Sequence, residues 1–392
     1  MSLSVYLVGA GLTKSLELSR RVPLMMDFIS VMADYVQNDI ILNTLITLEL
    51  GGVYATPCAE CKRFADNVKS DLSAVASSDR TRFANLLKGR SPESVEDLLT
   101  SASRVGANGN IWASGAATYF RYGINQLFAT VGWDLNLRVL EKFLSEQFSN
   151  RSRSHTFVCF NYDLALDKAV EDASNRSWQP RDGYGFEFAA WTTEDPASDH
   201  PNSAARAFST SCLPQSSPRI KILKPHGSLN WLQRRINAEA KAESHGESAE
   251  MLLPLDGDMK IRHWRSTNTF NYAQWNNDLP RDFEILIAPP TPDKQPVMQN
   301  ILEQEKEALA AADEIFLLGY SLPRTDTDQR DLIKRALRGN KSLGQLIIVN
   351  YGADDSYFRD MSELFGCEAT RFNEGFLKFV GCYSALSAST RT

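Results

Sequence analysis

Short apolar runs bounded by turn residues recur along the chain and predict buried strands. Their side chains are largely β-branched and apolar at successive positions, which favours a parallel sheet covered on both faces. The runs are Val5–Val8, Thr156–Phe160, Ile220–Leu223, Glu284–Ile287, Ile315–Leu318 and Leu346–Val349. Helical patterns lie between several of them, at Asp163–Ala173, Gln299–Ala312 and Asp328–Leu337. Alternating strands and helices predict an α/β fold built on a doubly wound parallel sheet.

The first two predicted strands are separated by far more chain than one crossover requires. Much of this interval has helical patterns, at Leu24–Leu50, Ala59–Ala76 and Leu135–Phe148. We therefore predict a single α/β domain over residues 1–392 with a large helical insertion at about residues 25–150. Two further segments, at about residues 191–218 and 235–277, contain many polar and turn-forming residues, which predict irregular insertions.

Composition narrows the class of protein. The 42 Lys and Arg residues and the 48 Asp and Glu residues leave a net charge of −6, which argues against nucleic-acid binding by bulk electrostatics. A membrane-spanning helix needs about 20 mostly apolar residues, and the sequence has neither such a run nor a basic, apolar leader. Six cysteines are too few for a disulfide scaffold. We expect a soluble, cytoplasmic protein that binds neither a membrane nor nucleic acid directly.

Polar residues follow five of the predicted strands, at the edge where open α/β sheets bind ligands. Gly9-Ala10-Gly11 follows the first strand, and two glycines there allow a tight turn and a close approach to a ligand. Lys14 occupies the position of the third glycine in a GxGxxG pattern. A tight turn without a ligand is therefore an equally good interpretation.

Asn161 and Asp163 follow the second strand. Because Asn is depleted in strands and needs a polar partner when buried, Asn161 is a candidate functional residue. Asp is a favoured helix N-cap, so for Asp163 alone we favour capping. His226 lies between Pro225 and Gly227 after the third strand. Histidine is the residue type most used in general acid–base chemistry, and this setting favours a functional residue slightly over a satisfied core histidine.

Two more strands end in Gly319-Tyr320-Ser321 and Asn350-Tyr351-Gly352. Each of these segments is compatible with an ordinary turn between a strand and a helix. The five strand ends taken together predict a polar rim along one edge of the sheet, a combination much less expected by chance than any single member.

These motifs, in this order, resemble the sirtuin-like (silent information regulator) family, in its bacterial branch that hydrolyses NAD in anti-phage defence. The resemblance spans roughly residues 3–352, with long unmatched insertions between the motifs. It rests on Gly9-Ala10-Gly11 with Ser15, Asn161-x-Asp163, His226-Gly227, Gly319-x-Ser321 and Asn350. It implies a Rossmann-like fold and an NAD glycohydrolase that produces nicotinamide and ADP-ribose.

The resemblance also implies residue roles. Asn161 and His226 would be catalytic, with Asn161 holding the water or the ribose hydroxyls and His226 acting as general base. Cleavage of the nicotinamide–ribose bond passes through an oxocarbenium-like sugar, as in glycoside hydrolysis. Because the cationic nicotinamide is already a good leaving group, no acid is needed to protonate it. The residues assigned to NAD binding are Gly9, Ala10, Gly11, Ser15, Asp163, Gly319, Ser321 and Asn350; for Asp163, capping remains equally open.

Three departures from deacylating sirtuins favour the hydrolase. Deacylases carry four zinc-binding cysteines after the catalytic His, whereas here only Cys367 and Cys382 follow it, and Cys58-x-x-Cys61 stands alone before the second strand. A tetrahedral zinc site needs four ligands, so we expect no zinc. Phe160 replaces the usual Gln before the catalytic Asn, and no convincing acyl-lysine-binding strand follows His226. An NAD-dependent protein deacylase and a non-catalytic NAD- or ADP-ribose-binding module remain alternatives.

An unregulated NAD hydrolase would kill its host, so the resemblance implies that activity is gated by self-assembly or by a separate partner. Similar stand-alone proteins pair with a HerA-like hexameric ATPase. The resemblance therefore implies an ATPase of this type as a partner.

The hydrophobic pattern within the predicted insertion generates a prediction about assembly. Ile40-Ile41-Leu42, Leu45-Ile46 and Leu48 make one helix apolar almost all round, which indicates burial on several sides. A core helix explains this as well as an oligomer interface does, but regulation through assembly favours the interface. We predict a homo-oligomer in light scattering at micromolar concentration. A 43.8 kDa monomer, with or without the ATPase, would contradict this prediction.

Overall fold

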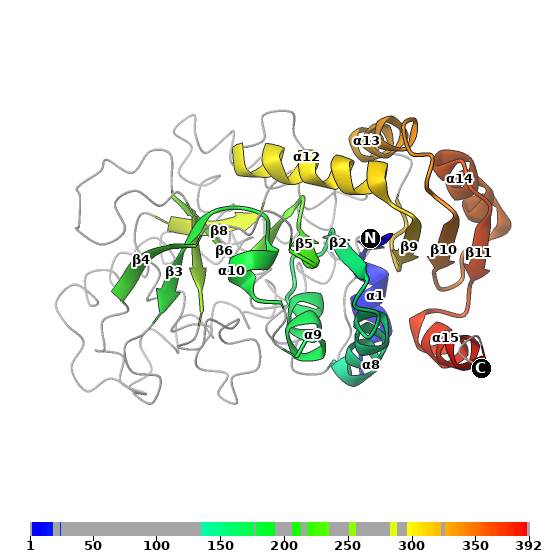
Figure 1. Ribbon diagram of the computed structural model, residues 1–392, viewed down its shortest axis with the longest axis horizontal. Helices are drawn as coiled ribbons and strands as arrows, with labels where there is room; N and C mark the ends of the chain where they lie inside the picture. Colours follow the sequence, from blue (N-terminus) through cyan, green and yellow to red (C-terminus); the bar gives the residue numbers. More distant parts are fainter. Residues whose placement is uncertain are drawn as a thin grey trace, which may run out of the picture. The chain divides into compact units, whose positions relative to one another are not determined.

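The computed structural model describes residues 2–18, 24, 135–175, 178–192, 206–212, 218–234, 251–255, 283–287, 296–322 and 326–389 (Figure 1). By its internal contacts the chain divides into two units, and every described residue except Leu24 belongs to the unit formed by Met1–Val22, Asp134–Trp264 and Arg281–Thr392. The predicted insertion lies outside the described residues as far as residue 134, and so does the helix of the assembly prediction.

A six-stranded parallel sheet forms the centre of this unit and confirms the predicted fold class. Its strands are β1 (Ser2–Val8), β2 (Arg153–Cys159), β5 (Ile220–Leu223), β9 (Glu314–Leu318), β10 (Gln345–Val349) and β11 (Ala369–Phe372). Their order is β11-β10-β9-β1-β2-β5, and every neighbouring pair is parallel. The chain thus steps outward from β1 on one side and then returns to fill the other, which is the strand order of the Rossmann fold. The order reverses between β1 and β9.

The centre of the sheet is held by aromatic side chains in register across three strands. Tyr6 of β1 is paired with Phe157 of β2 and Phe316 of β9. Its ring stacks on both, with centroids 4.4 Å and 4.8 Å apart, and Phe143 meets it edge-on at 6.4 Å. Offset stacked and edge-to-face rings add to the stabilisation that burial of their area provides.

Helices cover both faces of the sheet (Figure 1). One layer contains α12 (Pro296–Ala311), α13 (Thr327–Leu337) and α14 (Asp355–Phe365). The other contains α1 (Ala10–Ser15), α8 (Leu137–Phe148), α9 (Ala165–Ala173) and α15 (Phe376–Ser389). The predicted helices at Leu135–Phe148, Asp163–Ala173, Gln299–Ala312 and Asp328–Leu337 are confirmed as α8, α9, α12 and α13.

A second sheet of mixed direction has the order β4-β3-β7-β6-β8. Its strands are β3 (Phe188–Thr192), β4 (Arg206–Cys212), β6 (Gly227–Arg234), β7 (Met251–Pro254) and β8 (Phe283–Ile287). The predicted strand at Glu284–Ile287 is present as β8, but it pairs antiparallel with β6 here and is not part of the parallel sheet. Strands β4 and β7 lie within the segments for which an irregular course was predicted.

None of the helices in the described ranges is long and apolar enough to cross a membrane.

The amino-terminal part of β2 buries a histidine that cannot readily become charged. His155 is 1% exposed, and its Nδ1 lies 3.2 Å from the Tyr6 hydroxyl. Burial, with the positive charges of Arg219 and Arg153, lowers the pKa of His155 from 6.5 to about 3. Its Nε2 has no hydrogen-bond partner among the described residues. The folded protein therefore holds this imidazole neutral.

We predict that His155 makes the protein less stable in mild acid. The unfolded chain takes up a proton at His155 near pH 6.5 and the folded chain only near pH 3, so the free energy of unfolding falls as the pH drops through this window. His155→Leu should reduce that slope, measured by urea unfolding at several pH values. Tyr6→Phe is the control, because it removes the same hydrogen bond and leaves the imidazole to titrate. Equal slopes in both variants would contradict the prediction.

Candidate functional site

The five polar strand ends predicted from the sequence lie along one edge of the parallel sheet. Strands β10, β9, β1, β2 and β5 are consecutive neighbours and all parallel, so their carboxyl ends meet at the same edge. In an open α/β sheet, ligands bind at this edge where the strand order reverses. Here that point lies between the turns that follow β1 and β9.

These two turns are interlocked through their glycines. The Gly9 amide donates to the carbonyl of Leu318 at 3.1 Å, and the Gly11 amide donates to that of Gly319 at 2.9 Å. A Cβ on Gly9 would lie 2.7 Å from the Gly319 carbonyl oxygen, and one on Gly11 would lie 2.8 Å from it. Gly319 has φ +59°, and a Cβ there would lie 2.1 Å from the Leu12 nitrogen. Packing alone therefore requires glycine at these positions. All three of their amides are already engaged, that of Gly319 by the Val349 carbonyl at 2.8 Å.

Ala10 and Ser15 are the first and last residues of α1. The Ser15 hydroxyl donates to the carbonyl of Leu12 at 2.6 Å, one turn back in the same helix. The structure therefore gives the Ser15 side chain a local partner.

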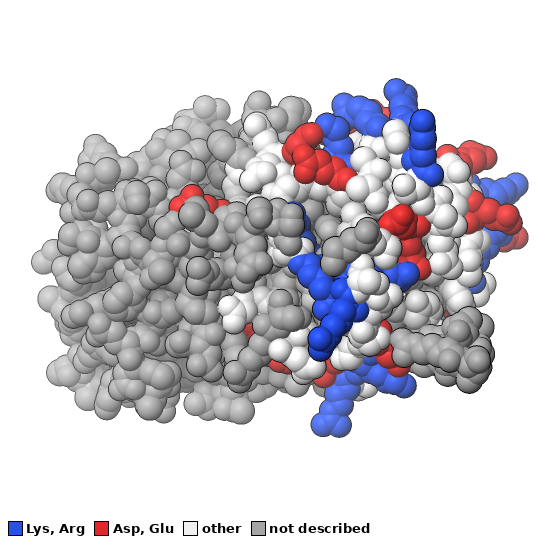
Figure 2. Space-filling view, viewed as in Figure 1, with Lys and Arg blue, Asp and Glu red and all other residues white. Residues whose placement is uncertain are grey.

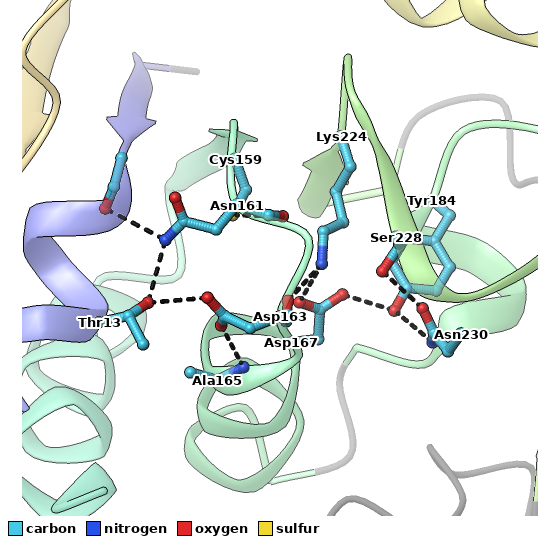
Figure 3. A network of polar contacts seen from close by, with 11 residues as sticks. Thr13, Cys159, Asn161, Asp163, Ala165, Asp167, Tyr184, Lys224, Ser228 and Asn230 are labelled. Atoms are coloured by element: carbon cyan, nitrogen blue, oxygen red, sulfur yellow. Dashed lines mark hydrogen bonds and ion pairs between the residues drawn. The ribbon is translucent and has the colours of Figure 1, made fainter. Parts of the chain in front are cut away.

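Asn161 is buried beside the turn that follows β1. Its Nδ2 donates to the Gly9 carbonyl at 3.1 Å and to Thr13 Oγ1 at 3.0 Å (Figure 3). Because a carbonyl oxygen can only accept, the amide nitrogen must be the atom that faces Gly9. The Asn161 Oδ1 consequently points away from Thr13, and no described residue donates a hydrogen bond to it. The polar partners predicted for a buried Asn are thus the Gly9 carbonyl and the Thr13 hydroxyl, and the Asn161 Oδ1 remains as an acceptor.

Asp163 supports two neighbouring elements. Its Oδ1 accepts from the Ala165 amide at 2.9 Å at the start of α9, and its Oδ2 accepts from Thr13 Oγ1 at 3.0 Å. The N-cap position of α9 is Leu164, so Asp163 acts one residue before it. Burial raises the pKa of the Asp163 carboxyl, while Lys224 opposes the shift. Asp163 therefore both satisfies the helix start and fixes the Thr13 hydroxyl that holds Asn161.

His226 lies in the turn between β5 and β6 and is 9% exposed. Its ring meets Phe160 edge-on, with centroids 5.6 Å apart. Phe160 also contacts Tyr320, which stacks on it with centroids 4.1 Å apart and planes within 7°. The three rings join the ends of β5, β2 and β9, and Phe160, which His226 contacts, directly precedes Asn161 in the chain.

Ser321 and Asn350 occupy the rim on the β9–β10 side. Ser321 is exposed, and Asn350 is half-buried with its Oδ1 accepting from the Tyr351 amide at 2.9 Å. The Tyr357 hydroxyl donates to the Tyr320 carbonyl at 2.6 Å, which ties α14 to the turn that follows β9. Neither rim residue is joined by a described hydrogen bond to Asn161 or His226.

A buried polar network behind the edge was not predicted from the sequence. Lys224 Nζ donates to the Asp163 carbonyl at 2.6 Å and pairs with Asp167 Oδ2 at 3.0 Å (Figure 3). Asp167 Oδ1 accepts from the Tyr184 hydroxyl at 2.6 Å, and Tyr184 follows the short helix α10 (Pro180–Gly183). Asn230 Nδ2 donates to Tyr184, and Ser228 Oγ donates to Asn230 Oδ1 at 2.7 Å.

The side chains in this network are removed from water. Lys224 and Asp167 are both 0% exposed. Burial, together with the neighbouring Asp167 carboxylate, raises the pKa of Tyr184 well above its ordinary value, so this phenol stays a donor. Lys224 and Asp167 are identified only by their pairing in the folded chain. In the sequence they are an ordinary lysine after a strand and an ordinary aspartate within a helix.

No group of three or more His, Cys, Asp or Glu side chains in the described ranges is arranged to hold a metal ion. Cys367 and Cys382 are free thiols, and Cys58 and Cys61 lie outside the described residues. Burial raises the pKa of the Cys159 thiol to about 12, which leaves it protonated near neutral pH. Figure 2 shows both basic and acidic side chains over the described part of one face, including a group of adjoining basic side chains near its middle.

We predict that Gly319→Ala strongly destabilises the protein. Alanine in a left-handed conformation costs about 1–2 kcal/mol, and overlap with a neighbouring backbone adds about 1–3 kcal/mol. Gly352→Ala is the matched control, because Gly352 has φ +66° and a Cβ there would meet nothing within 4 Å, so only the first cost applies. Chemical denaturation of both variants measures the difference. Equal losses would mean that the two turns are not in close contact.

Comparisons with known proteins identify no family for this chain. No protein-family model matches it, and no curated protein matches its sequence. The functional conclusion therefore depends on the residues and their geometry.

Proposed function

We propose that the protein is an NAD hydrolase that cleaves the nicotinamide–ribose bond to give nicotinamide and ADP-ribose. The observation that carries the proposal is the placement of Asn161 and His226. Both follow strands at the carboxyl edge of a sheet with Rossmann strand order. Asn161 is bonded to the Gly9 turn, where the strand order reverses, and His226 contacts the ring of Phe160, the residue before Asn161.

Asn161 supplies an acceptor of fixed direction. Its Nδ2 is committed to Gly9 and Thr13, so the Oδ1 is available for a ribose hydroxyl or the attacking water. A group held in place before the reaction loses little freedom in the transition state, which is the basis of catalysis by positioning. Thr13 and Asp163 provide this fixation through one hydrogen-bond chain.

His226 is the general base in this proposal, accepting the proton of the water or of a ribose hydroxyl. Nicotinamide leaves as a neutral molecule from a cationic substrate, so the leaving group needs no proton. What the site must supply is stabilisation of an oxocarbenium-like sugar and a correctly placed nucleophile.

The glycine turns would contribute to NAD binding mainly through the absence of side chains. The amides of Gly9 and Gly11 are occupied by Leu318 and Gly319, so they are not free donors for a phosphate in this conformation. In the proposal, Ala10, Ser15, Asp163, Ser321 and Asn350 complete the NAD-binding set.

The proposed biological role is NAD depletion in anti-phage defence. An enzyme of this activity has to be inactive until it is triggered. We propose that homo-oligomerisation or a HerA-like hexameric ATPase provides this control, as the family resemblance implies.

We predict that Asn161→Ala and His226→Ala each lower NAD cleavage by about 10²-fold or more, the scale on which a positioned catalytic group acts. Nicotinamide and ADP-ribose are quantified by chromatography, with and without the candidate ATPase. Asn340→Ala is the matched control, because the Asn340 amide group also donates two hydrogen bonds, in this case to the backbone carbonyls of Leu309 and Ala312, away from the site.

Three results would count against the proposal. Near-normal turnover in a folded Asn161 or His226 variant would show that the catalytic site is wrongly assigned. O-acyl-ADP-ribose formed from an acylated peptide would identify a deacylase. Thermal stabilisation by NAD without release of nicotinamide would identify a binding module.

A further inference from the structure

Lys224 and Asp167 form an ion pair inside the protein at a position where an apolar pair would be expected. Both side chains are 0% exposed, and the distance from Nζ to Oδ2 is 3.0 Å. The cost of removing two charges from water often exceeds their attraction, so such a pair is weak evidence for a stabilising role. Its place in the fold is more informative.

The pair lies between the two segments that carry the candidate catalytic residues. Lys224 is two residues before His226, and its Nζ donates to the carbonyl of Asp163, two residues after Asn161, at 2.6 Å. A second bond joins the same segments, from the Leu229 amide to the Tyr162 carbonyl at 3.1 Å. The ammonium group therefore bridges the loop after β2 and the turn after β5.

The remaining hydrogen bonds fix the ion pair itself. Asp167 Oδ1 accepts from Tyr184, and Tyr184 accepts from Asn230. Asn230 in turn accepts from Ser228, next to the Gly227 that follows His226. Buried polar networks in which the members are paired are rigid and hold one arrangement. The network therefore contacts the His226 turn at both ends, through Lys224 before His226 and through Ser228 after it.

We propose that Lys224 is a positioning residue for the site: held by Asp167, it fixes the Asn161 loop and the His226 turn relative to each other. This inference rests on the proposed NAD hydrolysis for its effect on turnover, but the fixing of the two segments can be measured without it. Lys224 touches no reacting atom in this role.

The test replaces the pair by apolar side chains. Removing one partner leaves the other buried and unpaired and can prevent folding, whereas replacing both is often neutral for stability. The principal variant is therefore Lys224→Met with Asp167→Leu. Asp167→Asn is the second variant, because it keeps the size and one acceptor while removing the charge. The control is Arg153→Met with Glu314→Leu, which removes an ion pair of 2.7 Å at the opposite end of the same sheet.

Two measurements are made on each variant: amide hydrogen exchange, and steady-state NAD cleavage. The principal variant should exchange faster in residues 160–164 and 224–230 and should lose about 10–10²-fold in kcat with KM nearly unchanged, because small misplacements of catalytic groups act on the reaction step. Asp167→Asn should show the same changes to a smaller extent. The control pair should alter neither measurement at the site.

Unchanged exchange in the two segments, or unchanged kcat despite faster exchange, would overturn the inference. A loss of turnover accompanied by an equal rise in KM would also overturn it, because it indicates general damage to binding. If the wild-type protein cleaves no NAD either alone or with the candidate ATPase, the proposed function fails, and hydrogen exchange alone decides whether Lys224 fixes these segments. If the principal variant does not fold, the hydrogen exchange and turnover of Asp167→Asn decide whether Lys224 positions the two segments.

Discussion

The carboxyl edge of the sheet depends on one close approach, between the backbones of the turns after β1 and β9. A side chain on Gly319 would overlap the nitrogen of Leu12, so the two turns can meet only without side chains. The Gly9 carbonyl held in this contact is also the acceptor for Asn161. Tyr320, the residue after Gly319, stacks on Phe160, whose ring contacts His226. Both candidate catalytic side chains are therefore located, directly or through one ring, relative to the same interlocked backbone.

The parallel sheet was largely predictable because its central strands are buried on both faces. Val5–Val8 of β1 and Ile315–Leu318 of β9 are almost completely inaccessible, and a continuous apolar run is the sequence pattern that such burial requires. The edge strand β11, Ala369–Phe372, has two exposed residues and no apolar run, so it was not predicted. The polar strand β4 was not predicted either, because it is a strand through its pairing with β3 and its own residues do not form an apolar run.

The candidate site was predictable only where a polar residue type stands in a sequence context that predicts burial. A buried Asn after a strand requires a partner, and the structure supplies Gly9 and Thr13. Thr13 itself carries no such signal, since a threonine in a short helix is ordinary until the chain folds. The pairing of Lys224 with Asp167 is equally invisible, because it depends on how β5 meets α9. Side chains that act through tertiary contacts are thus the part of a site that sequence patterns do not reveal.

The central place of β1 has a consequence for how the protein is made. Ser2–Val8 has both of its partners much later in the chain, in Arg153–Cys159 and Glu314–Leu318. During synthesis on the ribosome, this buried strand emerges before either partner and is enclosed on both sides only once β9 has been translated. Pairings so distant in sequence form slowly, and an unpaired apolar strand is prone to aggregate in the meantime. Chaperone binding to the nascent chain is the expected requirement of this topology.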